Sequence, residues 1–147
     1  MEIERKFLVK TFNSNGLKGE KVVQVYASLK PELRIRLKAD KAYLTLKSEG
    51  DLEREELEAE IDFNIAAGMV KHFSHRIEKT RYTIGRWEVD IYEGRLQGLI
   101  VAEVELEHKE EELPEPPGGL ELGKEVTEDK RFKNKNLAVS EGIPEIH

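Results

Sequence analysis

Charged side chains of one sign recur at alternate positions along several short segments of the chain. Arg34 and Arg36 are separated by one apolar residue, and so are Glu103 and Glu105. Residues two apart in a β-strand point to the same face, so each pair would present like charges side by side. Such charges repel one another unless a ligand binds between them. Clustered cations suit the oxygens of a polyphosphate, and clustered carboxylates suit its divalent metal ion.

Other segments show the same alternation of charged and apolar residues. Their charged positions are Glu2, Glu4 and Lys6, then Glu56, Glu58 and Glu60, and then Glu88 and Asp90. One such segment indicates no more than an antiparallel sheet with one solvated face. Several of them, many carrying one sign, favour a sheet that closes with its charged faces inward. Its apolar faces would then point outward, where helices and the C-terminal segment would cover part of them.

The elements that position these side chains are predicted to be short strands. Strands are expected at 2–10, 21–28, 33–39, 42–48, 54–63, 75–84, 86–93 and 99–108. Most connections are too short for parallel crossovers, so the sheet should be mainly antiparallel. Helical spacing of Ile65, Met69 and Phe73 predicts a helix at 64–73, and a second is expected near 134–141. The predicted fold is α+β and mainly antiparallel: an eight-stranded closed β-barrel with a few flanking helices.

Composition narrows the functional class. The chain has 147 residues, which predicts one domain spanning 1–147, and 37% of its residues are charged. It has no cysteine, and its four histidines lack metal-ligand spacing, so oxygen atoms should hold any metal. A net charge of −6 argues against a nucleic-acid surface, and the absence of a long apolar run argues against a membrane segment. A cytoplasmic protein is expected, and the sequence leaves a homodimer open.

Motifs along almost the whole chain resemble those of the CYTH superfamily, the triphosphate tunnel metalloenzymes. The matching stretches are 2–6 (Glu-Ile-Glu-Arg-Lys), 33–36 (Leu-Arg-Ile-Arg), 44–48 (Leu-Thr-Leu-Lys-Ser), 54–58 (Arg-Glu-Glu-Leu-Glu), 79–82 (Lys-Thr-Arg-Tyr), 88–90 (Glu-Val-Asp), 103–106 (Glu-Val-Glu-Leu) and 125–134. Leu57 stands at a usual aromatic position and Phe132 at a usual tyrosine. A single Glu-x-Glu-x-Lys motif is weak evidence, but these stretches occur in the family's order.

The resemblance implies a tunnel that binds a triphosphate group with Mg²⁺ or Mn²⁺. The implied substrate-binding residues are Lys6, Arg34, Arg36, Lys47, Lys79 and Arg81, and the implied metal ligands are Glu2, Glu4, Asp90, Glu103 and Glu105. Glu56 or Glu58 would orient the attacking water or a second ion. Lys79 would neutralise charge at the phosphoryl group that is cleaved.

Metal-dependent hydrolysis of inorganic triphosphate is the function that these motifs favour, although another triphosphate-bearing small molecule could be the substrate. A class IV adenylyl cyclase is an alternative, but the His-Phe opening of that group is missing. A thiamine or nucleoside triphosphatase is another, but no aromatic platform is evident near Arg34 or Arg36. A polyphosphate or nucleotide sensor without catalytic activity is the non-enzyme alternative, although a sensor would not need the acidic residues.

Overall fold

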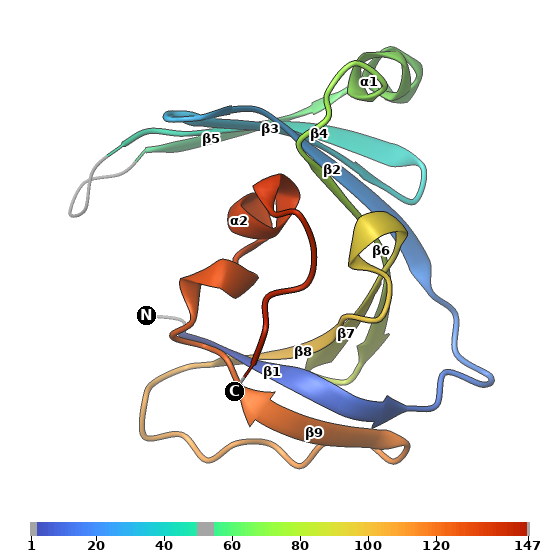
Figure 1. Cartoon of the computed structure of the whole chain (residues 1–147), viewed down its shortest axis with the longest axis vertical. Coiled ribbons are helices and arrows are strands. Elements are labelled where there is room, and N and C mark those ends of the chain that lie inside the picture. The colour runs from blue at the N-terminus through green and yellow to red at the C-terminus, as the bar shows by residue number, and fades with distance from the viewer. Residues whose placement is uncertain (1–2, 50–54, 147) are drawn as a thin grey trace.

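The computed structural model describes residues 3–49 and 55–146, so Glu2 and Arg54 lie outside the described residues. Within these residues nine antiparallel strands form one sheet in the order β5-β4-β3-β2-β6-β7-β8-β1-β9 (Figure 1). The elements are β1 (Ile3–Phe12), β2 (Glu20–Leu29), β3 (Glu32–Lys38), β4 (Lys41–Lys47), β5 (Glu56–Ile61), α1 (Phe63–Val70), β6 (Arg76–Ile84), β7 (Trp87–Tyr92), η1 (Gly94–Leu96), β8 (Ile100–Leu106), β9 (Leu120–Glu125), η2 (Lys130–Phe132) and α2 (Asn134–Val139).

The sheet curves strongly but stays open, so the predicted eight-stranded closed barrel is wrong in both closure and strand number (Figure 1). In an eight-stranded closed barrel, β1 would have to pair with β5. One edge of β1 pairs with β8, and the other pairs with β9, through Val9 opposite Leu122 and Phe12 opposite Leu120. The ninth strand, β9, which was not predicted, therefore occupies the edge of β1 that closure would require.

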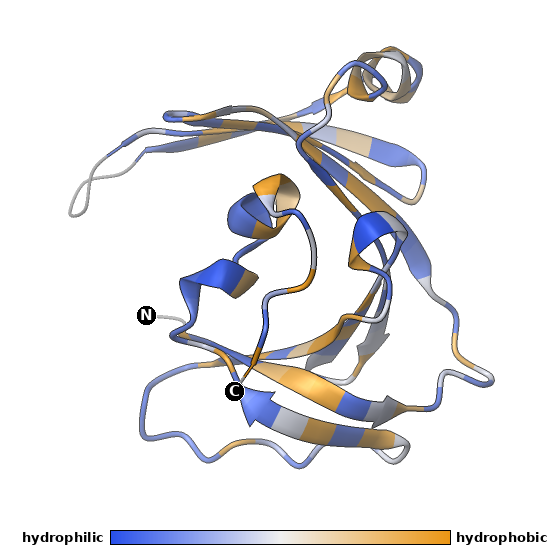
Figure 2. Cartoon of the chain, in the orientation of Figure 1, coloured by the Kyte–Doolittle hydropathy of each residue, from blue (hydrophilic) through white to orange (hydrophobic). Residues whose placement is uncertain are grey.

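The alternation of charged and apolar residues along the strands is clear in Figure 2. On the convex side, Ile35 and Ala42 pack with Ala66 and Val70 of α1. The Asp62 carboxylate caps this helix by accepting a hydrogen bond from the Ile65 backbone amide at 2.9 Å. The predicted helix at 64–73 is thus confirmed as α1, although it ends earlier.

A second convex cluster covers the strands at the other end of the sheet. It contains Phe7, Trp87, Val89, Ala102 and Val104. Trp87 is buried with its ring centroid 6.0 Å from that of Phe7, so it is a packing residue on the outer face.

The C-terminal segment lies on the concave side of the sheet, not on the outside as expected (Figure 1). Phe132 and Leu137 pack against Ile77, Tyr92 and Val101. The concave face carries an apolar area at one end, and burial of this area keeps η2 and α2 inside the curve. In the described part of the chain, no helix has the length and apolar character needed to cross a membrane.

Candidate active site

The register of the strands places the predicted charged residues on the concave face. Directly paired residues of antiparallel strands lie on the same face of a sheet. Lys6 pairs with Glu103, Glu103 with Glu88, and Arg81 with Asp90. On the other half of the sheet, Arg34 is opposite Thr45, and Thr45 is opposite Glu58. Arg36 is opposite Tyr43, and Lys47 is opposite Glu56. Residues from distant parts of the chain therefore share one curved surface.

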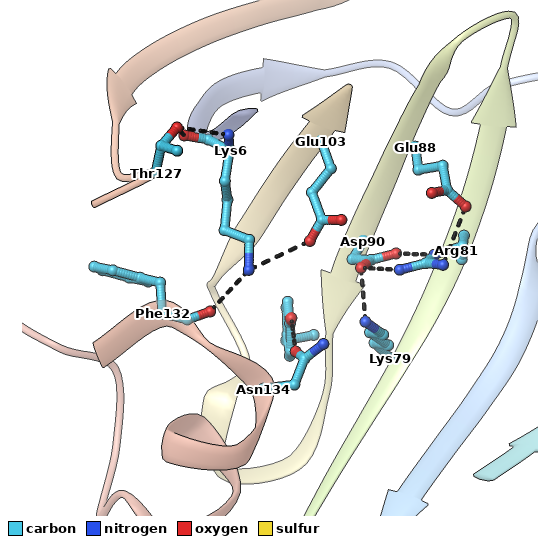
Figure 3. Close-up of polar contacts among 10 residues, drawn as sticks. Lys6, Lys79, Arg81, Glu88, Asp90, Glu103, Thr127, Phe132 and Asn134 are labelled. Atoms are coloured by element: carbon cyan, nitrogen blue, oxygen red, sulfur yellow. Dashed lines mark hydrogen bonds and ion pairs between the residues drawn. The ribbon is translucent and has the colours of Figure 1, made fainter. Parts of the chain in front are cut away.

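Asp90 is the centre of a buried charge cluster (Figure 3). Its carboxylate accepts a hydrogen bond from Lys79 Nζ at 2.7 Å and two from Arg81, from Nε at 2.8 Å and from Nη2 at 2.9 Å. Asp90 and Lys79 are each 1% exposed. Burial opposes ionisation of Asp90, but Lys79 and Arg81 outweigh it and lower the pKa of Asp90 to about 2. Burial also lowers the pKa of Lys79.

A second group of charges connects the first strand to β8 and to the C-terminal segment (Figure 3). Lys6 Nζ lies 3.4 Å from Glu103 Oε1 and donates a hydrogen bond to the Phe132 carbonyl at 3.1 Å. Burial, followed by the negative charge of Glu103, raises the pKa of Glu4 to about 7. The Glu4 carboxyl group therefore keeps its proton more readily than an exposed glutamate does, partly because the Glu103 carboxylate lies nearby.

The raised pKa of Glu4 gives an expected pH dependence of stability. The pKa of Glu4 is higher in the folded protein than its ordinary value of 4.5, so protonation of Glu4 stabilises the fold. This stabilisation is complete below pH 4.5. That effect is lost as the pH rises to about 7. The melting temperature of Glu4→Gln should therefore rise relative to that of the wild type as the pH increases across this range. A constant difference in melting temperature between the two proteins would contradict the raised pKa of Glu4.

Arg34 and Arg36 have donors without acceptors. The Nε atoms of both are buried and have no hydrogen-bond partner among residues 3–49 and 55–146. Burial, then the nearby guanidinium groups of Arg81 and Arg34, lowers the pKa of Arg36. Buried donors normally find acceptors, and the group that would satisfy these ones is an anion with several oxygens.

A cavity of about 250 Å³ opens beside Arg34. Its lining residues are Glu4, Lys6, Tyr26, Glu32, Arg34, Lys47, Lys133, Asn134 and Lys135. Lys133 and Lys135 were not predicted as site residues, although Lys133 lies in the family-like stretch 125–134. They reach the cavity because Tyr92 donates a hydrogen bond to Asn134 Oδ1 at 2.7 Å, and Arg95 donates to the carbonyls of Leu137 and Ser140.

The family model of the CYTH domain matches residues 1–139. The chain belongs to the CYTH family. It is 40% identical to the inorganic triphosphatase of Nitrosomonas europaea over 95% of this chain and 97% of that protein. It is also 35% identical to the inorganic triphosphatase of Acetivibrio thermocellus, over 92% of each. A crystal structure of an inorganic triphosphatase superposes with a TM-score of 0.76 at 37% identity, covering 99% of this chain and 97% of that one.

In this CYTH protein the predicted site residues lie in a cavity, in a buried charge cluster and at exposed positions. Glu4, Lys6, Arg34 and Lys47 line the cavity. Lys79, Arg81 and Asp90 form the buried cluster, and Glu105 is exposed opposite Glu4. Glu58 accepts a hydrogen bond from Thr45 at 2.7 Å, and Glu56 is exposed on edge strand β5.

The carboxylates on the concave face of the CYTH sheet fit a hard divalent cation in chemical type. Glu4 and Glu103 lie close enough to interact, and Glu105 is in register with Glu4. No three acidic or histidine side chains of the described segments are already gathered around one point. A bound cation would therefore need further oxygen atoms, which phosphate groups and water supply. Both oxygens of Asp90 already accept hydrogen bonds from cations.

Proposed function

We propose that this CYTH protein hydrolyses inorganic triphosphate with a divalent cation, Mg²⁺ or Mn²⁺. The observation that carries the proposal is the pair of buried donors, Arg34 Nε and Arg36 Nε, that have no acceptor in the described part of the chain and lie on a cationic concave face. A polyphosphate offers the oxygens that these donors lack. The names of the two bacterial relatives, both inorganic triphosphatases, support the same substrate.

The proposed cationic residues bind the phosphate chain from several strands. They are Lys6, Arg34, Arg36, Lys47, Lys79 and Arg81, joined by Lys133 and Lys135. Lys79 would neutralise charge at the cleaved phosphoryl group. Its ammonium group is held in place by Asp90, at 2.7 Å, and its Nζ lies 5.4 Å from the centroid of the Tyr92 ring. Such a fixed cation needs little reorganisation as charge develops on the phosphate oxygens.

The proposed metal ligands are Glu4, Glu103 and Glu105, with Glu2 and Asp90. Asp90 already accepts three hydrogen bonds from Lys79 and Arg81, which leaves about one lone-pair site, on Oδ1, for a cation. A divalent cation in this position supplies charge neutralisation and water activation. Glu56 or Glu58, on the opposite half of the sheet, would orient the attacking water.

One comparison of substrates tests the proposal. Tripolyphosphate, ATP, thiamine triphosphate and pyrophosphate are each incubated with the protein and either cation, and the release of phosphate and cyclic AMP is measured. Tripolyphosphate should be hydrolysed fastest, and chelation of the cation should stop the reaction. Equal or faster hydrolysis of ATP would contradict the substrate, and cyclic AMP as the main product would contradict the reaction.

An aromatic residue lies beside Arg34 in the structure. Tyr26 pairs with Arg34 across β2 and β3 and lines the cavity. However, it is only 4% exposed, and its hydroxyl accepts a hydrogen bond from Gln24. It therefore offers little ring surface on which a base or a thiamine ring could stack.

Arg36→Ala should weaken triphosphate binding with little loss of apo stability. Hydrogen bonds to a charged partner contribute enough that affinity should fall about 10- to 100-fold. The free protein loses a desolvated cation that other arginines repel, so its melting temperature should stay the same or rise. Calorimetric titration with tripolyphosphate measures the first effect and thermal melting the second. Arg86→Ala, on an exposed arginine paired with Glu111, is the matched control.

A further inference from the structure

One carboxylate in the cavity has no evident part in binding an anion. Glu32, the first residue of β3, lines the cavity, and its side chain is 12% exposed. It accepts a hydrogen bond from Arg34 Nη1 at 3.0 Å and pairs across the sheet with Lys47. Lys6, Lys133 and Lys135 line the same cavity.

Glu32 opposes phosphate binding in two ways. Its charge repels any phosphate group in the cavity, and its oxygen occupies a donor of Arg34 that a phosphate could use. A residue that lowers the affinity for every polyanion can still separate them, because Coulomb repulsion grows with the charge of the ligand.

We propose that Glu32 is a specificity-determining residue that limits the charge, and therefore the length, of the phosphate chain that the cavity accepts. The inference rests on the proposed function, since it concerns the same cavity. Strand register holds Glu32 opposite Lys47, and α2 borders the cavity with Lys133 and Lys135. A longer chain brings more negative charge into this space while Glu32 keeps part of the cationic lining neutralised.

The test compares pyrophosphate, tripolyphosphate and tetrapolyphosphate with the wild type and Glu32→Gln. Glutamine keeps an acceptor for Arg34 but removes the charge. Affinities from calorimetry, and kcat/KM from phosphate release at a fixed Mg²⁺ concentration, should improve by about threefold for pyrophosphate and about tenfold for tetrapolyphosphate. The preference for pyrophosphate over tetrapolyphosphate should therefore fall by about threefold. Glu111→Gln, on the partly buried partner of Arg86 outside the cavity lining, should leave this preference unchanged.

Glu32→Ala separates repulsion from a simple positioning of Arg34. Loss of the hydrogen bond to Arg34 will weaken binding of all three ligands if positioning matters, but the preference should shift as it does in Glu32→Gln. An unchanged preference in both variants would overturn the inference. If the wild type does not bind tripolyphosphate, the proposed function fails and the inference fails with it, whereas binding with an unchanged preference refutes the inference alone.

Discussion

Asp90→Asn should destabilise the protein by about 3–5 kcal/mol, the usual cost of breaking a buried ion pair from one side. Lys79 and Asp90 are each 1% exposed, and Lys79 Nζ lies 2.7 Å from the carboxylate. With asparagine in place, the Lys79 ammonium group remains buried without its anion. Because burial already lowers the pKa of Lys79, the lysine should lose its proton more readily, and turnover of triphosphate should fall as well.

Urea unfolding and triphosphate hydrolysis measure the two effects of Asp90→Asn. Asp129→Asn removes the acidic partner of Arg131 in an exposed pair and should change stability little. The double variant Lys79→Met with Asp90→Leu should recover part of the lost stability without activity, because apolar residues of similar size can replace a buried ion pair. The recovery is partial because, within the described residues, Arg81 keeps only Glu88 as an ion-pair partner. Wild-type stability in Asp90→Asn would show that the cluster contributes nothing to the fold.

Glu4→Gln and Glu105→Gln should each lower turnover by about 10- to 100-fold and raise the concentration of cation needed for half-maximal activity. The two glutamates are paired across β1 and β8, and Glu4 also lies close to Glu103. Removing one of these like charges relieves repulsion, so the apo melting temperature should stay the same or rise. Loss of activity without loss of stability is the pattern of a ligand-binding group.

The same variants can be compared in the bound state. Cation plus triphosphate should raise the wild-type melting temperature, because the ligands bind only the folded protein, and should raise that of the glutamate variants less. Glu121→Gln, on an exposed position of β9, is the control and should behave as the wild type does. If Glu4→Gln and Glu105→Gln unfolded readily but kept their activity, both residues would be structural partners, not metal ligands.

Much of the architecture could be predicted because a strand's two-residue period is local. Arg34 and Arg36 share a face wherever the strand is placed, and Ile35 between them must face the other way, as its packing against α1 confirms. The same period also reaches Glu32, two residues before Arg34. The predicted strand began one residue too late, at residue 33, and so left out Glu32, which lines the cavity.

Pairing between strands that are far apart in the chain could not be predicted from the sequence. Whether the sheet closes depends on which strand takes the second edge of β1, and β9 takes it through contacts more than 100 residues distant, such as Phe12 with Leu120. The ion-pair partners of a charged residue depend on such pairing as well. Asp90 contacts Lys79 and Arg81 because β6 and β7 pair in one register.

The amino-acid sequence by itself determined the alternation, the family-like motifs and the class of ligand, because these follow from residue type and spacing. Only the tertiary structure decided that the sheet is open, that α2 lies inside it with Lys133 and Lys135 beside the cavity, and that Arg34 and Arg36 keep buried donors without acceptors. Each of these depends on distances between segments far apart in the chain. Such distances are set by the packing of the apolar faces and by strand register, which no short stretch of sequence contains.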